Sequence, residues 1–167
     1  MTRTPIWLVV AKKGSTGVTY VEAVEEALCF GWIDSRPNTL DAQHYKLRFS
    51  PRRPTSVWSK ISKERIRRLI AGGRMTPAGL AVIEAARADG SWGTLDAVDA
   101  LVVPEDLAAA LAASPKAARH FDAFPPSSKK MILFWIQDAK RAETRAKRIA
   151  ETVRLAARNE RGNHWRP

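Results

Sequence analysis

The chain has 167 residues, 45% of them hydrophobic and 27% charged, and a formal net charge of +11. This composition excludes wholesale disorder and predicts one globular domain, or a domain with a small appended subdomain. Purely apolar runs such as 6–11 are far shorter than the roughly 20 residues of a membrane span. A single cysteine, Cys29, excludes an intramolecular disulfide and a thiolate-rich metal site. We therefore expect a soluble, cytoplasmic protein without a secretory leader.

The chain opens with a strand and a helix. The run 6–11 is rich in β-branched residues, which predicts a buried strand. Thr19 and Glu22 have the spacing of a capping box, so a helix is predicted over 20–30. Gly31 is well placed to end that helix, because glycine adopts the left-handed conformation without strain.

The next two segments predict a β-hairpin. Residues 32–35 form its first strand, and residues 44–50 alternate between apolar and polar side chains, the period of a half-buried strand. The alternation places the aromatic and aliphatic side chains on one face and basic side chains on the other. Asp34 is a candidate to lie across the hairpin from one of those basic groups. Prolines at 51 and 54 end the second strand.

Everything after Trp58 predicts helix, with Ser62 and Ser127 as two of the caps and an irregular segment at 92–102. The expected helices are 63–71, 77–89, 104–113, 115–124, 128–139 and 143–158. We predict an α+β fold, a small antiparallel β-sheet with a packed helix followed by a C-terminal helical bundle. The expected domains are an α+β domain at 1–92 and a helical subdomain at 93–167, or one continuous domain.

The positive charge is concentrated in two stretches. Residues 46–68 hold nine basic residues against Glu64, a local charge of +8, and residues 140–166 have a local charge of +6. Basic patches attract anions such as nucleic acids, acidic membrane surfaces and acidic partners. Surplus arginine side chains can also simply cover solvent-exposed helix faces without binding a partner. Both interpretations remain open at this level.

Residue types that carry catalysis or bind metals lack the spacing that such sites need. His44, His120 and His164 are scattered over different predicted elements, without a cluster of cysteines or carboxylates beside them. The sequence has no phosphate-binding loop, dinucleotide fingerprint or nucleophile elbow. It therefore predicts no cofactor, no metal and no catalytic residue.

One constellation between residues 32 and 60 combines basic side chains, aromatics and a predicted helix start. Its members are Trp32, Asp34, Arg36, Arg48, Arg52, Arg53, Trp58, Ser59 and Lys60. As an anion-binding site, it would use Arg48 and Arg52 as a clamp and Trp58 as a stacking face. In the alternative interpretation, Trp32 and Trp58 anchor the core and Asp34 pairs with an arginine at a strand end.

Three motifs in this region, Gly31-Trp32-Ile33-Asp34, Arg48-Phe49-Ser50-Pro51-Arg52-Arg53-Pro54 and Trp58-Ser59-Lys60, resemble the YdeI/OmpD-associated family, also called bacteriocin-protection proteins. Similar motifs at 73–80 and 139–145 extend the resemblance over nearly the whole chain. Members of that family usually have an extra strand and helix before the segment corresponding to 6–13. The resemblance therefore implies that this chain starts late relative to the family.

The resemblance implies a bacterial stress-protection protein with no assigned catalytic residue or cofactor. Our leading hypothesis is a non-enzymatic binding module linked to envelope or antimicrobial-peptide stress. Its expected partner is an unidentified protein or a small anionic ligand at residues 32–60. A nucleic-acid-binding protein that uses the two basic stretches is the first alternative. An enzyme that acts on a small anionic substrate through Asp34, Arg48 and Arg52 is the second.

Overall fold

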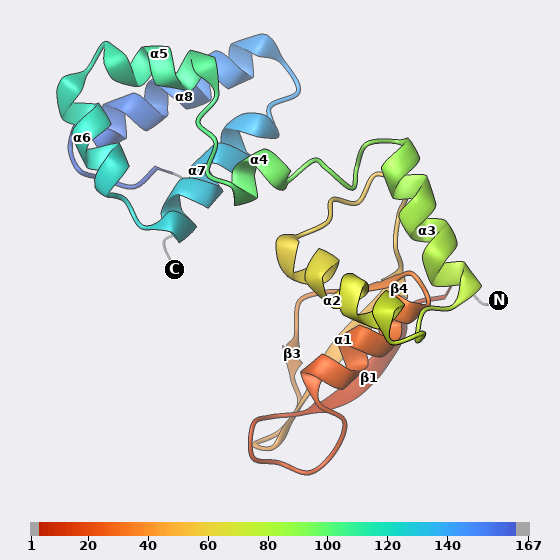
Figure 1. The fold of residues 1–167 in the computed structure, drawn as a ribbon. Coiled ribbons are helices and arrows are strands. Elements are labelled where there is room, and N and C mark those ends of the chain that lie inside the picture. The colour runs from red at the N-terminus through yellow and green to blue at the C-terminus, as the bar shows by residue number, and fades with distance from the viewer. Residues whose placement is uncertain (1–3, 163–167) are drawn as a thin grey trace. The chain divides into compact units, whose positions relative to one another are not determined.

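The computed structural model describes residues 4–162, and the chain divides into two compact units, residues 1–94 and 95–167 (Figure 1). The first unit carries a four-stranded sheet with helices, and the second consists of helices. The predicted α+β fold is confirmed. Whether the two units are separate domains with the predicted boundary stays a prediction. Each unit is described below by itself.

The sheet of the first unit is antiparallel and built around its longest strand. It contains β1 (Ile6–Ala11), β2 (Trp32–Asp34), β3 (Asn38–Thr39) and β4 (His44–Pro51). Strand β4 pairs with β1 along one side and with both β2 and β3 along the other. The predicted hairpin is therefore present as the β2–β4 pair, and β1 is an edge strand of the same sheet.

Alternation along the strands separates two faces of the sheet. Val10, Leu47 and Phe49 are buried in the core of the first unit, so the helices cover this face. On the other face, Trp7 lies opposite Arg48 in the register, and both side chains are exposed. We call these the covered face and the open face.

Helix α1 (Tyr20–Cys29) begins as its sequence predicts. The Thr19 hydroxyl accepts a hydrogen bond from the Glu22 backbone N–H at 3.3 Å, and Glu22 Oε2 accepts one from the Thr19 backbone N–H at 2.9 Å. This reciprocal pair is a capping box. Gly31 follows the helix with a φ of +73°, where a side chain would be strained.

Helix α2 (Lys60–Ala71) begins three residues before its predicted start, because its cap is Ser59 and not Ser62. The Ser59 hydroxyl accepts a hydrogen bond from the Ser62 backbone N–H at 3.2 Å. Two serines at this spacing both satisfy the sequence pattern for a cap. Helix α3 (Pro77–Ala88) follows, with Thr76 as its cap and proline at its first position.

Helices α1 and α3 approach closely at a glycine. A Cβ atom added to Gly79 would lie 2.2 Å from the Cys29 carbonyl oxygen. The Thr76 hydroxyl donates to the same oxygen at 2.6 Å. This contact joins the end of α1 to the start of α3 and completes the core beneath the covered face.

The second unit contains five helices between Leu95 and residue 162. They are α4 (Asp96–Asp99), α5 (Glu105–Ala112), α6 (Pro115–Ala123), α7 (Pro126–Gln137) and α8 (Ala142–Ala156). The short α4 was not predicted. Ser127 does not cap α7, because the helix already begins at Pro126 and its N-cap, Pro125, makes no side-chain hydrogen bond. Among the described residues, no helix combines the length and apolar character of a membrane span.

Candidate functional site

The register of the sheet separates two residues of the predicted anion site. Asp34 pairs with Phe49, and directly opposite residues of an antiparallel pair share a face. Asp34 therefore lies on the covered face, whereas Arg48 lies on the open face opposite Trp7. The expectation that Asp34 lies across from a basic residue of the hairpin is wrong. Asp34 and Arg48 therefore do not face one common site.

Arg52 and Trp58 are buried and form a contact with each other. The Arg52 guanidinium carbon lies 3.6 Å from the centroid of the Trp58 ring. Arg52 Nη1 donates to the Val57 carbonyl oxygen at 3.1 Å. The side chains are 8% and 1% exposed, and Trp92 packs 5.1 Å from Trp58 between ring centroids. Of the predicted clamp and stacking face, Arg52 and Trp58 are therefore not open to a ligand, because Arg52 itself occupies a face of Trp58.

Arg52 is an unusually buried cation. Desolvation lowers the pKa of its guanidinium to about 10, against a smaller opposing influence of the Asp34 charge. Arg52 Nε and Trp58 Nε1 are both buried and have no hydrogen-bond partner among the described residues. The π face of Trp58 is thus a principal compensation for this buried cation. Arg52 and Trp58 therefore both belong to the core. The alternative interpretation of the sequence expected this position for Trp58.

The other predicted site residues have three different environments. Arg36, Arg53 and Lys60 are exposed, and Ser59 caps α2. Trp32 and Asp34 each line a hollow of the first unit. The nine residues therefore do not form one site, and the two that line hollows direct attention to the covered face.

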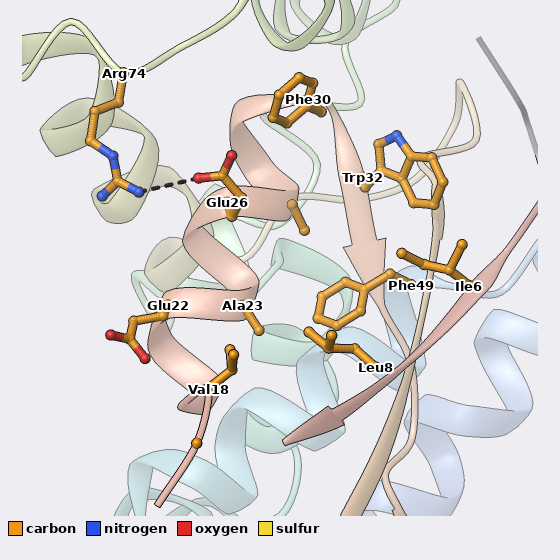
Figure 2. A pocket seen from close by; sticks show the side chains of 12 residues that line it. Ile6, Leu8, Val18, Glu22, Ala23, Glu26, Phe30, Trp32, Phe49 and Arg74 are labelled. Carbon is orange, nitrogen blue, oxygen red and sulfur yellow. Dashed lines mark hydrogen bonds and ion pairs between the residues drawn. The ribbon is translucent and has the colours of Figure 1, made fainter. Parts of the chain in front are cut away.

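The larger hollow, which we call the apolar groove, has a volume of about 790 Å³ and lies between α1 and the sheet (Figure 2). Leu8, Trp32 and Phe49 reach it from three strands. Its other wall comes from α1 and the residues beside it, with Val18, Ala23, Ala27 and Phe30. Figure 2 labels Leu8, Val18, Ala23, Phe30, Trp32 and Phe49 around the groove.

Part of the lining is unusually exposed for apolar side chains. Ile6 at one end of the groove is 52% exposed, and Val18 and Phe30 are also exposed. Exposed apolar side chains around a hollow are typical of ligand-binding surfaces. Neither Ile6 nor Val18 belongs to the predicted site, because a strand residue and a loop residue give no local sign of the hollow that they share.

Charged side chains stand at the rim of the groove. Glu22 and Glu26 come from α1, and Arg74 follows α2. Arg74 Nη2 lies 3.5 Å from Glu26 Oε2, and its Nη1 lies 3.2 Å from Glu25 Oε2. Hydrogen bonds from the Thr19 backbone and hydroxyl lower the pKa of the Glu22 carboxyl. The rim is therefore slightly acidic in a protein that is strongly basic overall.

A smaller, polar pocket of about 440 Å³ contains Asp34. The Tyr20 hydroxyl donates to Asp34 Oδ2 at 3.1 Å. Burial, and then the Asp34 charge, raises the pKa of the Tyr20 phenol, and the same two causes raise that of Tyr45. Lys12 and Thr39 also line the pocket. Three of these neighbours were not predicted because they are far from Asp34 in the sequence: Lys12 follows β1, Tyr20 begins α1 and Tyr45 belongs to β4.

Many residues of the two basic stretches are engaged in contacts within their own unit. Lys63 is buried, with its Nζ 5.4 Å from the Trp92 ring centroid. In the second unit, Arg145 forms two hydrogen bonds with the Asp106 carboxylate, at 2.6 and 2.9 Å, and Arg148 donates to the Trp135 carbonyl. The end of the second stretch at Arg166, like His164, lies outside the described residues. The net charges of these stretches therefore overstate the positive charge available to a partner.

Within residues 4–162, no three side chains among His, Cys, Asp and Glu lie close enough together to hold a metal ion. Cys29 is buried, and desolvation raises the pKa of its thiol. A raised pKa leaves the thiol protonated and a poor nucleophile at neutral pH.

The fold and its hollows thus define a two-unit α+β protein with a ligand-sized apolar groove in its first unit. Residues 100–159, which lie within the second unit, match the family described as Bacteriocin-protection, YdeI or OmpD-Associated. This match confirms the family resemblance. Residues 1–82, which hold the motifs between 31 and 60, match a domain of unknown function, DUF8412. No curated protein and no solved structure matched the chain.

Proposed function

We propose that the protein is a non-enzymatic binding module that acts in protection against bacteriocins or related envelope stress, and that the apolar groove is its ligand site. The observation that supports this proposal most directly is a hollow of about 790 Å³ with exposed apolar side chains along it. Ligand pockets of roughly 300–1,000 Å³ accommodate small molecules. The cytoplasmic location expected from the sequence belongs to the same proposal.

The lining and rim favour a particular kind of ligand. An apolar body would contact Leu8, Phe49 and Ala27, where it gains from leaving water. The acidic rim formed by Glu22 and Glu26 favours a neutral or cationic end over an anionic one. The proposed ligand is therefore an apolar or amphipathic small molecule and not the small anion that the sequence predicts.

The net charge of +11 limits how such a protein would protect a cell. It repels cationic peptides at distances shorter than the Debye length, which is about 8 Å at physiological salt. Direct sequestration of cationic peptides is therefore disfavoured. We propose that protection is indirect and depends on the ligand of the groove or on a protein partner.

The test is a fluorescence titration with N-phenyl-1-naphthylamine, an uncharged apolar probe. The wild-type protein should bind it at a single saturable site. Ala27→Phe places a large side chain in the groove and should weaken binding about tenfold or more, since it removes volume that the probe needs. Ala85→Phe on the exposed side of α3 is the matched control and should leave binding unchanged.

A second measurement tests the charge preference. Decyltrimethylammonium, a cation, should displace the probe at a lower concentration than decanoate, an anion. Glu26→Gln removes a negative charge from the rim, so it should reduce the difference between these two displacing concentrations. Equal binding of the probe to wild type and to Ala27→Phe would refute the groove as the site. A preference for decanoate would refute the role of the acidic rim.

A further inference from the structure

The open face of the sheet presents an exposed indole between apolar and basic side chains. Trp7 is 53% exposed and Val9 is 50% exposed, although both belong to β1. In the register Trp7 lies opposite Arg48 and Val9 opposite Lys46. These four side chains share the open face, because alternate residues of a strand and their cross-strand partners point to the same side.

The charge on this face has a single sign among the described strands. Asp34 is the only acidic residue in the four described strands, and it lies on the covered face. Lys46 Nζ lies 6.0 Å from the Trp7 ring centroid, and Arg48 is exposed. The described strands therefore give the open face an aromatic ring and two cations, whereas the nearby carboxylate of Asp41, in the loop before β4, lies 3.2 Å from His44 at one end of that face.

We propose that the open face binds single-stranded nucleic acid, with a base stacked on Trp7 and phosphates paired with Lys46 and Arg48. Proteins that bind single strands combine exposed aromatic rings with cationic side chains along the backbone path. A duplex hides its bases from such a ring, so the surface favours a single strand. This second binding surface is on the opposite side of the sheet from the apolar groove and does not depend on it.

The position of the surface agrees with the distribution of charge. Lys46 and Arg48 belong to the basic stretch 46–68, in which Arg52 and Lys63 are buried in the core. Lys46 and Arg48 are therefore two members of this basic stretch that lie beside an aromatic ring on an exposed surface. Charge complementarity favours a polyanion here over a neutral or basic peptide.

The experiment measures fluorescence anisotropy of labelled oligothymidylate, oligouridylate and a DNA duplex of equal length over a salt series. Both single strands should bind more tightly than the duplex. Trp7→Ala should weaken binding about tenfold, and Trp7→Phe should restore most of the affinity, because any aromatic ring stacks with a base. The double variant Lys46→Glu with Arg48→Glu should weaken binding further and lower the salt dependence by about two charges.

Control variants make the same chemical changes elsewhere. Phe134→Ala removes an exposed aromatic side chain from α7, and Arg119→Glu with Lys147→Glu reverses two exposed charges of the second unit. All of them should bind as the wild type does, and circular dichroism checks that every variant is folded. Heparin serves as a control polyanion without bases. Equal affinity of the protein for heparin and oligothymidylate, or unchanged binding by Trp7→Ala, would overturn the proposal. A dimer in sedimentation that Trp7→Ala dissociates would instead assign this face to a second copy of the chain.

Discussion

The Arg52 guanidinium carbon lies 3.6 Å from the ring centroid of Trp58, with both side chains buried in the core of the first unit. Such a contact places a cation against the negative face of an indole, which stabilises the charge where water is absent. The aliphatic part of Arg52 also fills core volume. The contact therefore contributes to the stability of the fold and not to a ligand site.

Arg52→Ala should destabilise the protein by about 2–4 kcal/mol, because it leaves a cavity over Trp58. Arg52→Met should cost far less, since a buried charge replaced by an apolar side chain of similar size is often neutral. Urea denaturation followed by tryptophan fluorescence measures both. Arg53→Ala, at an exposed neighbour, should change stability by less than about 0.5 kcal/mol. A similar loss in all three variants would contradict this role.

Ser59→Ala should lower stability by about 1 kcal/mol, because it removes the acceptor for the Ser62 backbone N–H at the start of α2. Ser62→Ala should cost less than half of that, since its backbone N–H keeps the Ser59 acceptor. Thermal unfolding of the two variants side by side gives the comparison. A larger effect of Ser62→Ala would restore the start of α2 that the sequence predicts.

Gly79→Ala should destabilise the protein by roughly 1–3 kcal/mol, because its Cβ would lie 2.2 Å from the Cys29 carbonyl oxygen and would push α3 away from α1. Gly72→Ala is the control, since an added Cβ there comes no closer than 3.4 Å to a neighbouring atom and the φ is negative. Chemical denaturation measures the difference. Equal stability of the two variants would show that α1 and α3 have room to separate.

The Asp106–Arg145 contact predicts a dependence of stability on pH. Hydrogen bonds from Arg145 are the largest cause that lowers the pKa of the Asp106 carboxyl. A carboxyl whose pKa is lower in the folded state stabilises the fold above its ordinary pKa of about 3.9, and the contribution disappears as the pH falls below that value. Because Asp106 is largely solvated, the contribution is at most about 1 kcal/mol.

Asp106→Asn should therefore lower the urea midpoint at pH 6 and have little effect near pH 2.5. Glu105→Gln removes the neighbouring carboxylate of α5 and serves as the control. A constant difference between wild type and Asp106→Asn across this range would contradict the assignment.

Local signals in the sequence predicted much of the fold. Thr19 and Glu22 lie within one turn and form the capping box that their spacing predicts. The alternation around Leu47 likewise depends on neighbours in the sequence and correctly identified β4. The sequence did not identify Ser59 as the cap of α2, because Ser62 fits the same local pattern. Only the packing of the helix distinguishes the two serines.

The candidate site was much less predictable. Asp34 and Arg48 were grouped because they are close in sequence, but the register that places them on opposite faces depends on how β2 and β4 pair. The apolar groove is a space between α1 and the sheet, and such a space has no signature in any one of these segments alone. Trp58 was ambiguous because an indole suits both a core and a stacking surface.

The pairing of β4 on both sides leaves β1 as an edge of the sheet. This strand, Ile6–Ala11, contains no charged side chain and no proline, the features that usually prevent an edge from pairing with another chain. Near its end, the Ala11 backbone N–H donates to the Val18 carbonyl at 2.9 Å, so the loop that follows protects that end. Among residues 4–162 no strand pairs with the outer side of β1, so the sheet can grow there by addition of a strand beside Ile6 to Val9. Self-association at high concentration should begin there, and a lysine at position 9 would oppose it.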